Sequence, residues 1–164
     1  MTINTTDFYD WQKAGKLQAV KYKKNSPNLE AIKDEVLKRF GGTSKGMFCR
    51  RTIRGGTDPS SHAFGAAWDW GYPSRKVATD VMNWLVANSQ EFGVQAIHDY
   101  VGCRIWRSKR VGGKAGWKKQ KPDNVGMGQA WAKWLHVETT KTMWGNRTPI
   151  VNRGRSASES SVLP

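Results

Sequence analysis

The stretch SSHAFGAAWD at residues 60–69 constrains the fold more than any other part of this chain. It places His62 seven positions before Asp69, with only small or aromatic residues between them. If residues 64–70 form a strand that is entered from a turn, the imidazole before the strand and the carboxylate within it can converge on one metal ion. A histidine far downstream, His136, would complete three ligands. A hydrolytic zinc site needs three protein ligands and one open position.

The surroundings of Asp69 strengthen the metal hypothesis. Asp69 lies between Trp68 and Trp70 in the sequence, and a carboxylate in an aromatic setting is costly unless it is paired or holds a metal. The chain has only three histidines, and a lone histidine is more often structural than a ligand. Residue type and spacing therefore point to a metal site without establishing one.

Patterns on either side of this stretch predict an α+β fold with a small, mostly antiparallel sheet flanked by helices. The first helix begins after Ser26-Pro27 and ends at Gly41-Gly42, and the second begins after Ser74 and ends at Gly93. Further strands are predicted at 47–54, 94–100 and 103–107. The basic, glycine-rich residues 108–128 are predicted to form a long surface loop, and order returns at 131–139.

The length of 164 residues suits one domain with a sizeable core. We predict an N-terminal extension over residues 1–25, a domain over 26–151 and a flexible, polar tail over 152–164. The chain has no long apolar run and no basic-then-apolar start. We therefore expect no membrane insertion and no signal peptide.

The formal net charge of +14 indicates an anionic partner. Nucleic acid, a membrane surface and an anionic wall polymer all satisfy this, and charge alone does not choose among them. The basic segment 108–121 is expected to contact such a polymer. Trp106 and Trp117 are predicted to stack on sugars or peptides there.

Five residues of the opening stretch match the pattern Ser-x-His-x-x-Gly-x-Ala-x-Asp, namely Ser60, His62, Gly65, Ala67 and Asp69. This pattern resembles that of the zinc D-Ala-D-Ala carboxypeptidases and phage endolysin peptidases, within the LAS-type peptidoglycan peptidases. The resemblance covers roughly residues 45–140 and implies a single LAS-type domain. It also implies a Zn²⁺ ion held by His62, Asp69 and His136, the last in a His-Val-Glu motif similar to the late strand of that family.

The resemblance also implies substrate-binding residues. Members usually carry an arginine on a strand before the histidine motif, where it contacts the substrate. Arg51 and Arg54 are our candidates, with Arg50 as a further one, and Ser60 is assigned to substrate binding as well. A guanidinium group suits this role because it grips a carboxylate in two places.

The chain departs from the family at the general base. The family has an acid three residues before the last histidine, where this chain has Lys133, and a lysine accepts a proton only if its pKa is strongly depressed. Glu138 and Asp99 are the alternative catalytic residues. Glu138 can instead orient His136, and Asp99 can be a surface carboxylate or a paired one. For His98, an oxyanion donor, a fourth ligand and a core residue are open, and we favour a core or orienting role.

The resemblance implies a zinc metallopeptidase that cleaves stem-peptide or cross-bridge amide bonds of peptidoglycan. A phage lysin or a tail-associated protein fits best, located in the virion or in the host cytoplasm before lysis and acting on the cell wall. Other virion or tail proteins are further expected partners. One alternative is a wall-binding or virion structural module with weakened catalysis, which Lys133 favours. A basic nucleic-acid-binding protein is the third, but we expect no nucleic-acid partner because no such motif is evident.

Overall fold

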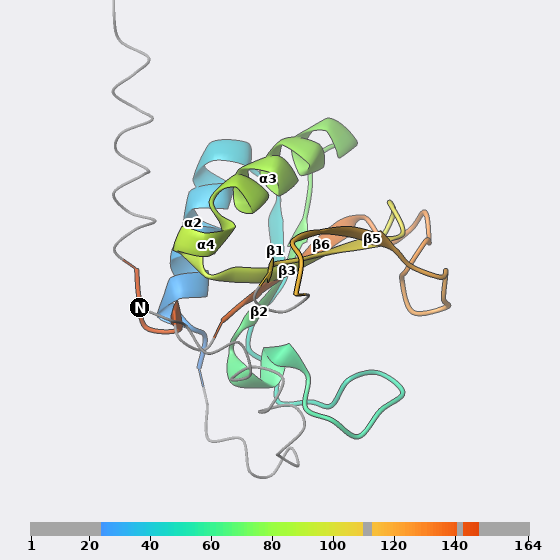
Figure 1. The fold of residues 1–164 in the computed structure, drawn as a ribbon, viewed down its shortest axis with the longest axis horizontal. Helices are drawn as coiled ribbons and strands as arrows, with labels where there is room; N and C mark the ends of the chain where they lie inside the picture. The colour runs from blue at the N-terminus through green and yellow to red at the C-terminus, as the bar shows by residue number, and fades with distance from the viewer. Residues whose placement is uncertain (1–23, 110–112, 141–142, 148–164) are drawn as a thin grey trace, which may run out of the picture.

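A computed structural model of the chain describes residues 24–109, 113–140 and 143–147. In these ranges the chain forms a six-stranded antiparallel sheet, with helices over one face and a short 3₁₀ helix, η2, beyond the other (Figure 1). In chain order the elements are α2 (Pro27–Phe40), β1 (Thr43–Gly46), η2 (Ser61–Phe64), β2 (Ala67–Gly71), α3 (Arg75–Ala87), α4 (Ser89–Phe92), β3 (Val94–Asp99), β4 (Arg104–Arg107), β5 (Gly116–Lys119) and β6 (Trp134–Thr139). The strand order is β1-β2-β6-β3-β4-β5. The predicted α+β class is confirmed.

The predicted segments at the two ends of the chain are largely outside this description. The tail over 152–164 lies outside the described residues, as do residues 1–23 of the N-terminal extension. The predicted domain over 26–151 contains every helix and strand named above.

Helix α2 has the bounds that its sequence predicts. The side chain of Ser26 accepts a hydrogen bond from the Leu29 backbone N–H at 3.2 Å, and Pro27 occupies the first helical position. At the other end, the Gly41 N–H bonds the Leu37 carbonyl. No described helix is both long enough and apolar enough to span a bilayer.

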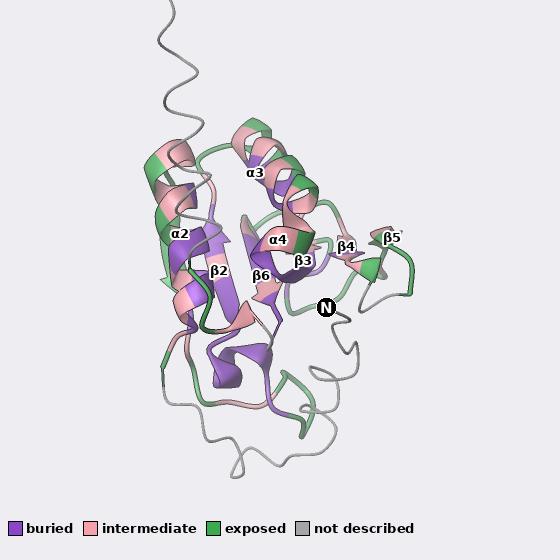
Figure 2. Ribbon diagram, turned by 60° about the vertical axis from the view of Figure 1, so that its left-hand side comes forward, coloured by how far each residue is buried: buried purple, intermediate pink, exposed green. Residues whose placement is uncertain are grey.

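The two faces of the sheet have different roles. Trp68 and Trp70 of β2 are fully buried on the face that the helices cover. Figure 2 shows β2 as a mostly buried strand. The indole N–H groups of the two tryptophans donate to the Ser44 hydroxyl and the Gly41 carbonyl, each at 3.0 Å, so both large rings are buried with their polar atoms satisfied. Because side chains alternate along a strand, Asp69 points to the opposite, open face.

Several predicted elements differ from the observed ones. Residues 47–54 form no strand, and their part in sheet-like pairing is the single bridge between Thr52 and Pro59. The second predicted helix is divided at Asn88 into α3 and α4. The predicted loop over 108–128 contains strand β5, which pairs with β4. The predicted strand over 64–70 begins later, because η2 occupies its first residue.

Candidate metal centre

The 3₁₀ helix η2 presents His62 to the open face of the sheet. The Ser60 hydroxyl oxygen caps this helix by accepting a hydrogen bond from the His62 backbone N–H at 3.4 Å. Gly65 ends η2 with a φ of 64°, and a side chain there would collide with the backbone of a neighbouring segment. The Nδ1 of His62 contacts the Met47 carbonyl oxygen. Because a carbonyl only accepts, Nδ1 carries the proton and Nε2 presents a lone pair.

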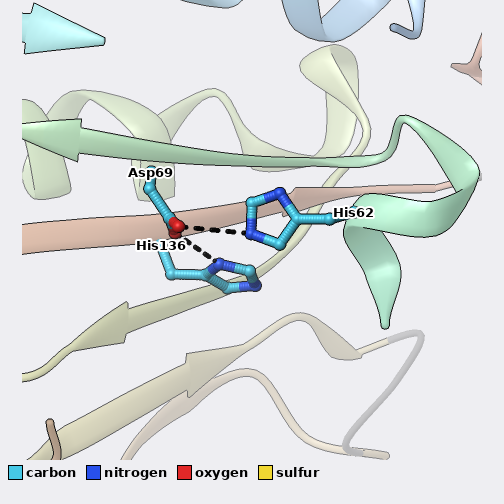
Figure 3. A group of neighbouring side chains, drawn as sticks. All are labelled: His62, Asp69 and His136. Carbon is cyan, nitrogen blue, oxygen red and sulfur yellow. Dashed lines mark hydrogen bonds and ion pairs between the residues drawn. The ribbon is translucent and has the colours of Figure 1, made fainter. Parts of the chain in front are cut away.

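Strand register brings three site residues from three strands into one row. Asp69 on β2 is opposite His136 on β6, which is opposite His98 on β3, and side chains in such a row share one face. The Oδ1 of Asp69 lies 2.8 Å from Nδ1 of His136, and its Oδ2 lies 3.3 Å from Nε2 of His62 (Figure 3). The structure thus brings together all three residues that were predicted as metal ligands.

Glu138 contacts the nitrogen of the His136 ring that faces away from Asp69. The Nε2 of His136 lies 3.0 Å from Oε1 of Glu138. That carboxylate also accepts hydrogen bonds from the Ser61 hydroxyl at 3.0 Å and from the Gln95 amide at 3.2 Å. Burial alone would raise the pKa of Glu138, but the bond with His136 holds it well below its usual range. Glu138 is therefore an anion that fixes the orientation of the His136 ring.

The donor atoms of His62, Asp69 and His136 fit a zinc ion. They lie within 4.8 Å of one another. The Nε2 of His62 is buried and has no hydrogen-bond partner among the described residues, and it faces a carboxylate oxygen, so the two lone pairs repel unless a cation lies between them. Burial would lower the pKa of His136, yet its bonds to Asp69 and Glu138 raise it to about 9. A divalent cation can take the place of that extra proton, because imidazole nitrogen and carboxylate oxygen are zinc ligands.

A second group of donor atoms, from His98, His136 and Glu138, also lies within 4.8 Å. It fits a metal less well, because the Glu138 carboxylate also accepts hydrogen bonds from Ser61 and Gln95, whereas the first group includes His62 Nε2, which has no hydrogen-bond partner among the described residues. Burial, and then the neighbouring His136, lower the pKa of His98 to about 4, so its imidazole is neutral at neutral pH. His98 lines a cleft above the sheet, so it is not a core residue, and its Nε2 lies 4.0 Å from Oε1 of Glu138; the orienting role, the other favoured one, stays a prediction.

Asp99 is not at this site, which corrects its predicted catalytic role. It is opposite Leu135 in the sheet and lies on the helix-covered face, fully buried. Arg75 of α3 donates to its Oδ1 at 2.6 Å, and Arg104 of β4 donates to its Oδ2 at 2.8 Å. Burial would raise the pKa of Asp99, but these two guanidinium groups and the Gly102 N–H lower it. Asp99 is a structural anion that ties α3 to the sheet.

The three predicted substrate-binding residues line a cleft of about 390 Å³ above the metal centre. Arg51 and Arg54 lie at its rim, where Arg54 Nη1 donates to the Val125 carbonyl at 3.3 Å. Ser60 also lines the cleft, but the contact that its hydroxyl makes is the cap of η2. Lys133, which stands where LAS-type peptidases have an acid as general base, is exposed and does not line the cleft.

Two aromatic residues that line the cleft were not predicted from the sequence. Tyr100 and Trp134 both line it. Side chains alternate along a strand, so Tyr100 shares a face with His98 in the predicted strand 94–100, and Trp134 precedes His136 by two residues. The sequence therefore contains a signal for both. The two tryptophans predicted to stack on ligands lie elsewhere: Trp106 is 3% exposed and belongs to the core, and Trp117 packs against that core.

We expect Glu138→Gln to lower zinc affinity about 10–100-fold without abolishing binding, because the amide keeps the size of the side chain but holds the His136 ring less firmly. Competition with a zinc chelator measures the change. Glu35→Gln on α2 is the matched control and should match the unmodified chain. Unchanged affinity in Glu138→Gln would contradict an orienting role.

Comparison with known proteins gives a match to a family model. The family model described as "VldE, C-terminal domain" matches residues 22–130, which is more than half of the chain. The matched range contains His62, Asp69 and His98 and ends before His136. No curated protein and no solved structure matches. The matched range holds every described helix and every described strand except β6, and on this match the chain belongs to the VldE C-terminal domain family.

Proposed function

We propose that this chain is a zinc-dependent peptidase that hydrolyses stem-peptide or cross-bridge amide bonds of peptidoglycan. The observation that carries the proposal is the convergence of His62 Nε2, Asp69 and His136 Nδ1 at an open cleft, which Asp69 and His136 line. The other nitrogen of each imidazole is already taken, by the Met47 carbonyl and by Glu138. Two oriented imidazoles and one carboxylate form the ligand set of a hydrolytic zinc site. The resemblance of residues 60–69 to LAS-type peptidases points the same way.

His62, Asp69 and His136 would hold the metal in this proposal. Zinc supplies Lewis acidity, which polarises a carbonyl group and lowers the pKa of water toward neutrality. The protein contributes the fixed geometry of the three ligands, since Ser60 positions His62 and Glu138 positions His136. Arg51 and Arg54 at the rim provide guanidinium groups for a substrate carboxylate.

His98 is the residue that we assign to proton transfer. Lys133 is exposed outside the cleft, Asp99 is on the other face, and Glu138 is engaged with His136. The ring of His98 lies 4.8 Å from that of His136, centroid to centroid, and lines the cleft. The pKa of His98 is lowered to about 4, so its imidazole is neutral at neutral pH and keeps one nitrogen that can accept a proton, although it is a weaker base than an ordinary histidine.

We expect His98→Ala to keep one equivalent of zinc and to lose hydrolysis by about 10²–10⁴-fold, which is the usual contribution of a general acid–base group. Metal analysis and single-turnover cleavage of a cross-linked stem peptide measure the two quantities. Loss of zinc in this variant would instead make His98 a ligand. Full hydrolysis would exclude it from proton transfer.

The place of action follows from the substrate. We propose that the protein is phage-encoded, as a lysin or a tail-associated enzyme, and is present in the virion or in the host cytoplasm before it reaches the wall. Its net charge of +14 would hold it on a wall rich in carboxylates and phosphates. Virion or tail proteins are the further partners of a tail-associated form.

The proposal is tested by incubating the purified full chain with peptidoglycan, with and without a chelator. New amino termini that appear only without the chelator would support the peptidase. One equivalent of zinc without cleavage would favour the second candidate, a wall-binding module. The observation that supports this candidate is Lys133, which stands where LAS-type peptidases have an acid. Salt-sensitive DNA binding without bound metal would overturn the proposal in favour of a nucleic-acid-binding protein.

A further inference from the structure

A series of ring contacts leads from the metal centre to the protein surface. It begins at His136 and His98, whose centroids are 4.8 Å apart. It continues through Tyr100, 6.1 Å from His98, and Trp134, 5.1 Å from Tyr100, to Trp131, 5.7 Å from Trp134. We call Tyr100, Trp134 and Trp131 the aromatic track. Its first two members line the cleft, so the track extends the cleft away from the metal centre.

Trp131 is exposed although it is the largest type of apolar side chain. Its exposed fraction is 58%, the highest among the large hydrophobic residues described. The ring is nevertheless supported, because it leans on Trp134 at an interplanar angle of 45°. An exposed tryptophan held in place beside a cleft offers a flat apolar surface for a ligand at little further ordering cost.

The polar groups beside the track limit the kind of ligand. Gln120 and Asp123 line the same cleft, and the floor carries the carboxylates of Asp69 and Glu138. A pyranose ring has an apolar C–H face that fits an indole, and hydroxyl groups at its edge that donate to carboxylate and amide oxygens. Because the cleft also carries Arg51, Arg54 and Lys121, charge alone does not exclude a phosphodiester chain, and the binding test below includes single-stranded DNA for that reason.

We propose that the aromatic track binds a pyranose ring of the substrate's glycan, so that the protein prefers sugar-bearing stem peptides to free peptides. This inference rests on the proposed peptidase function. Trp134 precedes His136 by two residues on the same face of β6, which corresponds to about 6.6 Å along the strand. A sugar over Trp134 and a reacting amide at the metal centre are therefore separated by roughly two residues of extended peptide.

The binding test uses the metal-free full chain and a β-1,4-linked N-acetylglucosamine disaccharide, measured by saturation-transfer NMR and titration. We expect binding to weaken at least about fivefold in Trp131→Ala and to be retained in Trp131→Phe, which keeps an aromatic face. Ile53→Ala is the matched control, because Ile53 is 43% exposed and lines the cleft away from the track. Equal binding by Trp131→Ala, or none by the unmodified chain, would overturn the proposal. The proposal would also be overturned if Trp131→Ala lost binding to single-stranded DNA but kept its binding to the disaccharide.

The activity test compares a disaccharide-linked stem peptide with the same peptide after removal of the sugar. We expect KM to be about tenfold lower for the sugar-bearing substrate. Trp131→Ala should remove that difference and leave kcat unchanged. Equal KM values in the unmodified chain would overturn the role of the track. Cleavage of neither substrate would overturn the peptidase function, and the disaccharide measurement alone would then decide whether the track binds sugar.

Discussion

Replacing Asp69 with alanine is expected to abolish stoichiometric zinc binding and hydrolysis. Asp69 lies between the two imidazoles, 3.3 Å from His62 Nε2 and 2.8 Å from His136 Nδ1. Burial would raise its pKa, but the hydrogen bond with His136 and the closeness of His62 hold it well below the usual range, so the native group is an anion that attracts a cation. The affinity should fall by more than the roughly 10–100-fold that loss of an outer hydrogen-bond partner costs.

Metal analysis after dialysis against a defined zinc concentration measures this loss. Asp80→Ala is the matched control, because Asp80 lies on α3 and pairs with the exposed Lys76. It should retain one equivalent of zinc and full hydrolysis. One equivalent of zinc in Asp69→Ala would show that the ligand set is wrong.

The second large effect concerns stability. Asp99→Ala should lower the free energy of unfolding by about 3 kcal/mol, because it leaves the guanidinium groups of Arg75 and Arg104 without their shared anion. The two arginine side chains are 41% and 36% exposed and can be partly solvated. The expected loss of unfolding free energy therefore lies at the lower end of the range for breaking a buried ion pair. Urea denaturation measures it, and Asp80→Ala should change stability by less than about 0.5 kcal/mol.

The effect of Asp99 should depend on pH with a defined sign. Its folded-state pKa is lowered, so its stabilisation is fully present above the unfolded value of about 3.9 and is lost as pH falls through the folded value. The stability difference between the unmodified chain and Asp99→Ala should therefore be constant from pH 7 to 5 and shrink below pH 4. A difference that does not change down to pH 3 would contradict an ionised Asp99.

Local signals predicted the parts of the fold that depend on local chemistry. The cap at Ser26, the proline after it and the glycine at position 41 define α2. Strand β5, over Gly116–Lys119, has no such signal: it is short and basic, and its place comes from pairing with β4 and from Arg104 lying over the Trp117 ring, 4.4 Å from its centroid. Such long-range pairing is not visible in a local pattern.

Residues 47–54 were predicted to form a strand that the structure does not contain. Their composition favours a strand, but their backbone groups serve the loop that holds η2. The Met47 carbonyl contacts His62 Nδ1, and the Cys49 N–H bonds the His62 carbonyl at 3.1 Å. The requirement to position His62 therefore overrides the strand propensity.

The site was predicted where the sequence pattern is compact and missed where it depends on strand register. His62 and Asp69 belong to one ten-residue pattern. Alternation along β3 separated His98 from Asp99 correctly, but which of the two faces the cleft depends on how β3 pairs with β6 and on where the helices pack. Without that knowledge, the sequence predicts Asp99 as one of two alternative catalytic residues and His98 as a core or orienting residue.

The most direct measurement of the central claim is anomalous diffraction at the zinc absorption edge from crystals of the full chain grown with zinc. The account predicts one strong peak within about 2.0–2.2 Å of His62 Nε2, an Asp69 oxygen and His136 Nδ1. A peak among His98, His136 and Glu138, or no peak at either group, would contradict it.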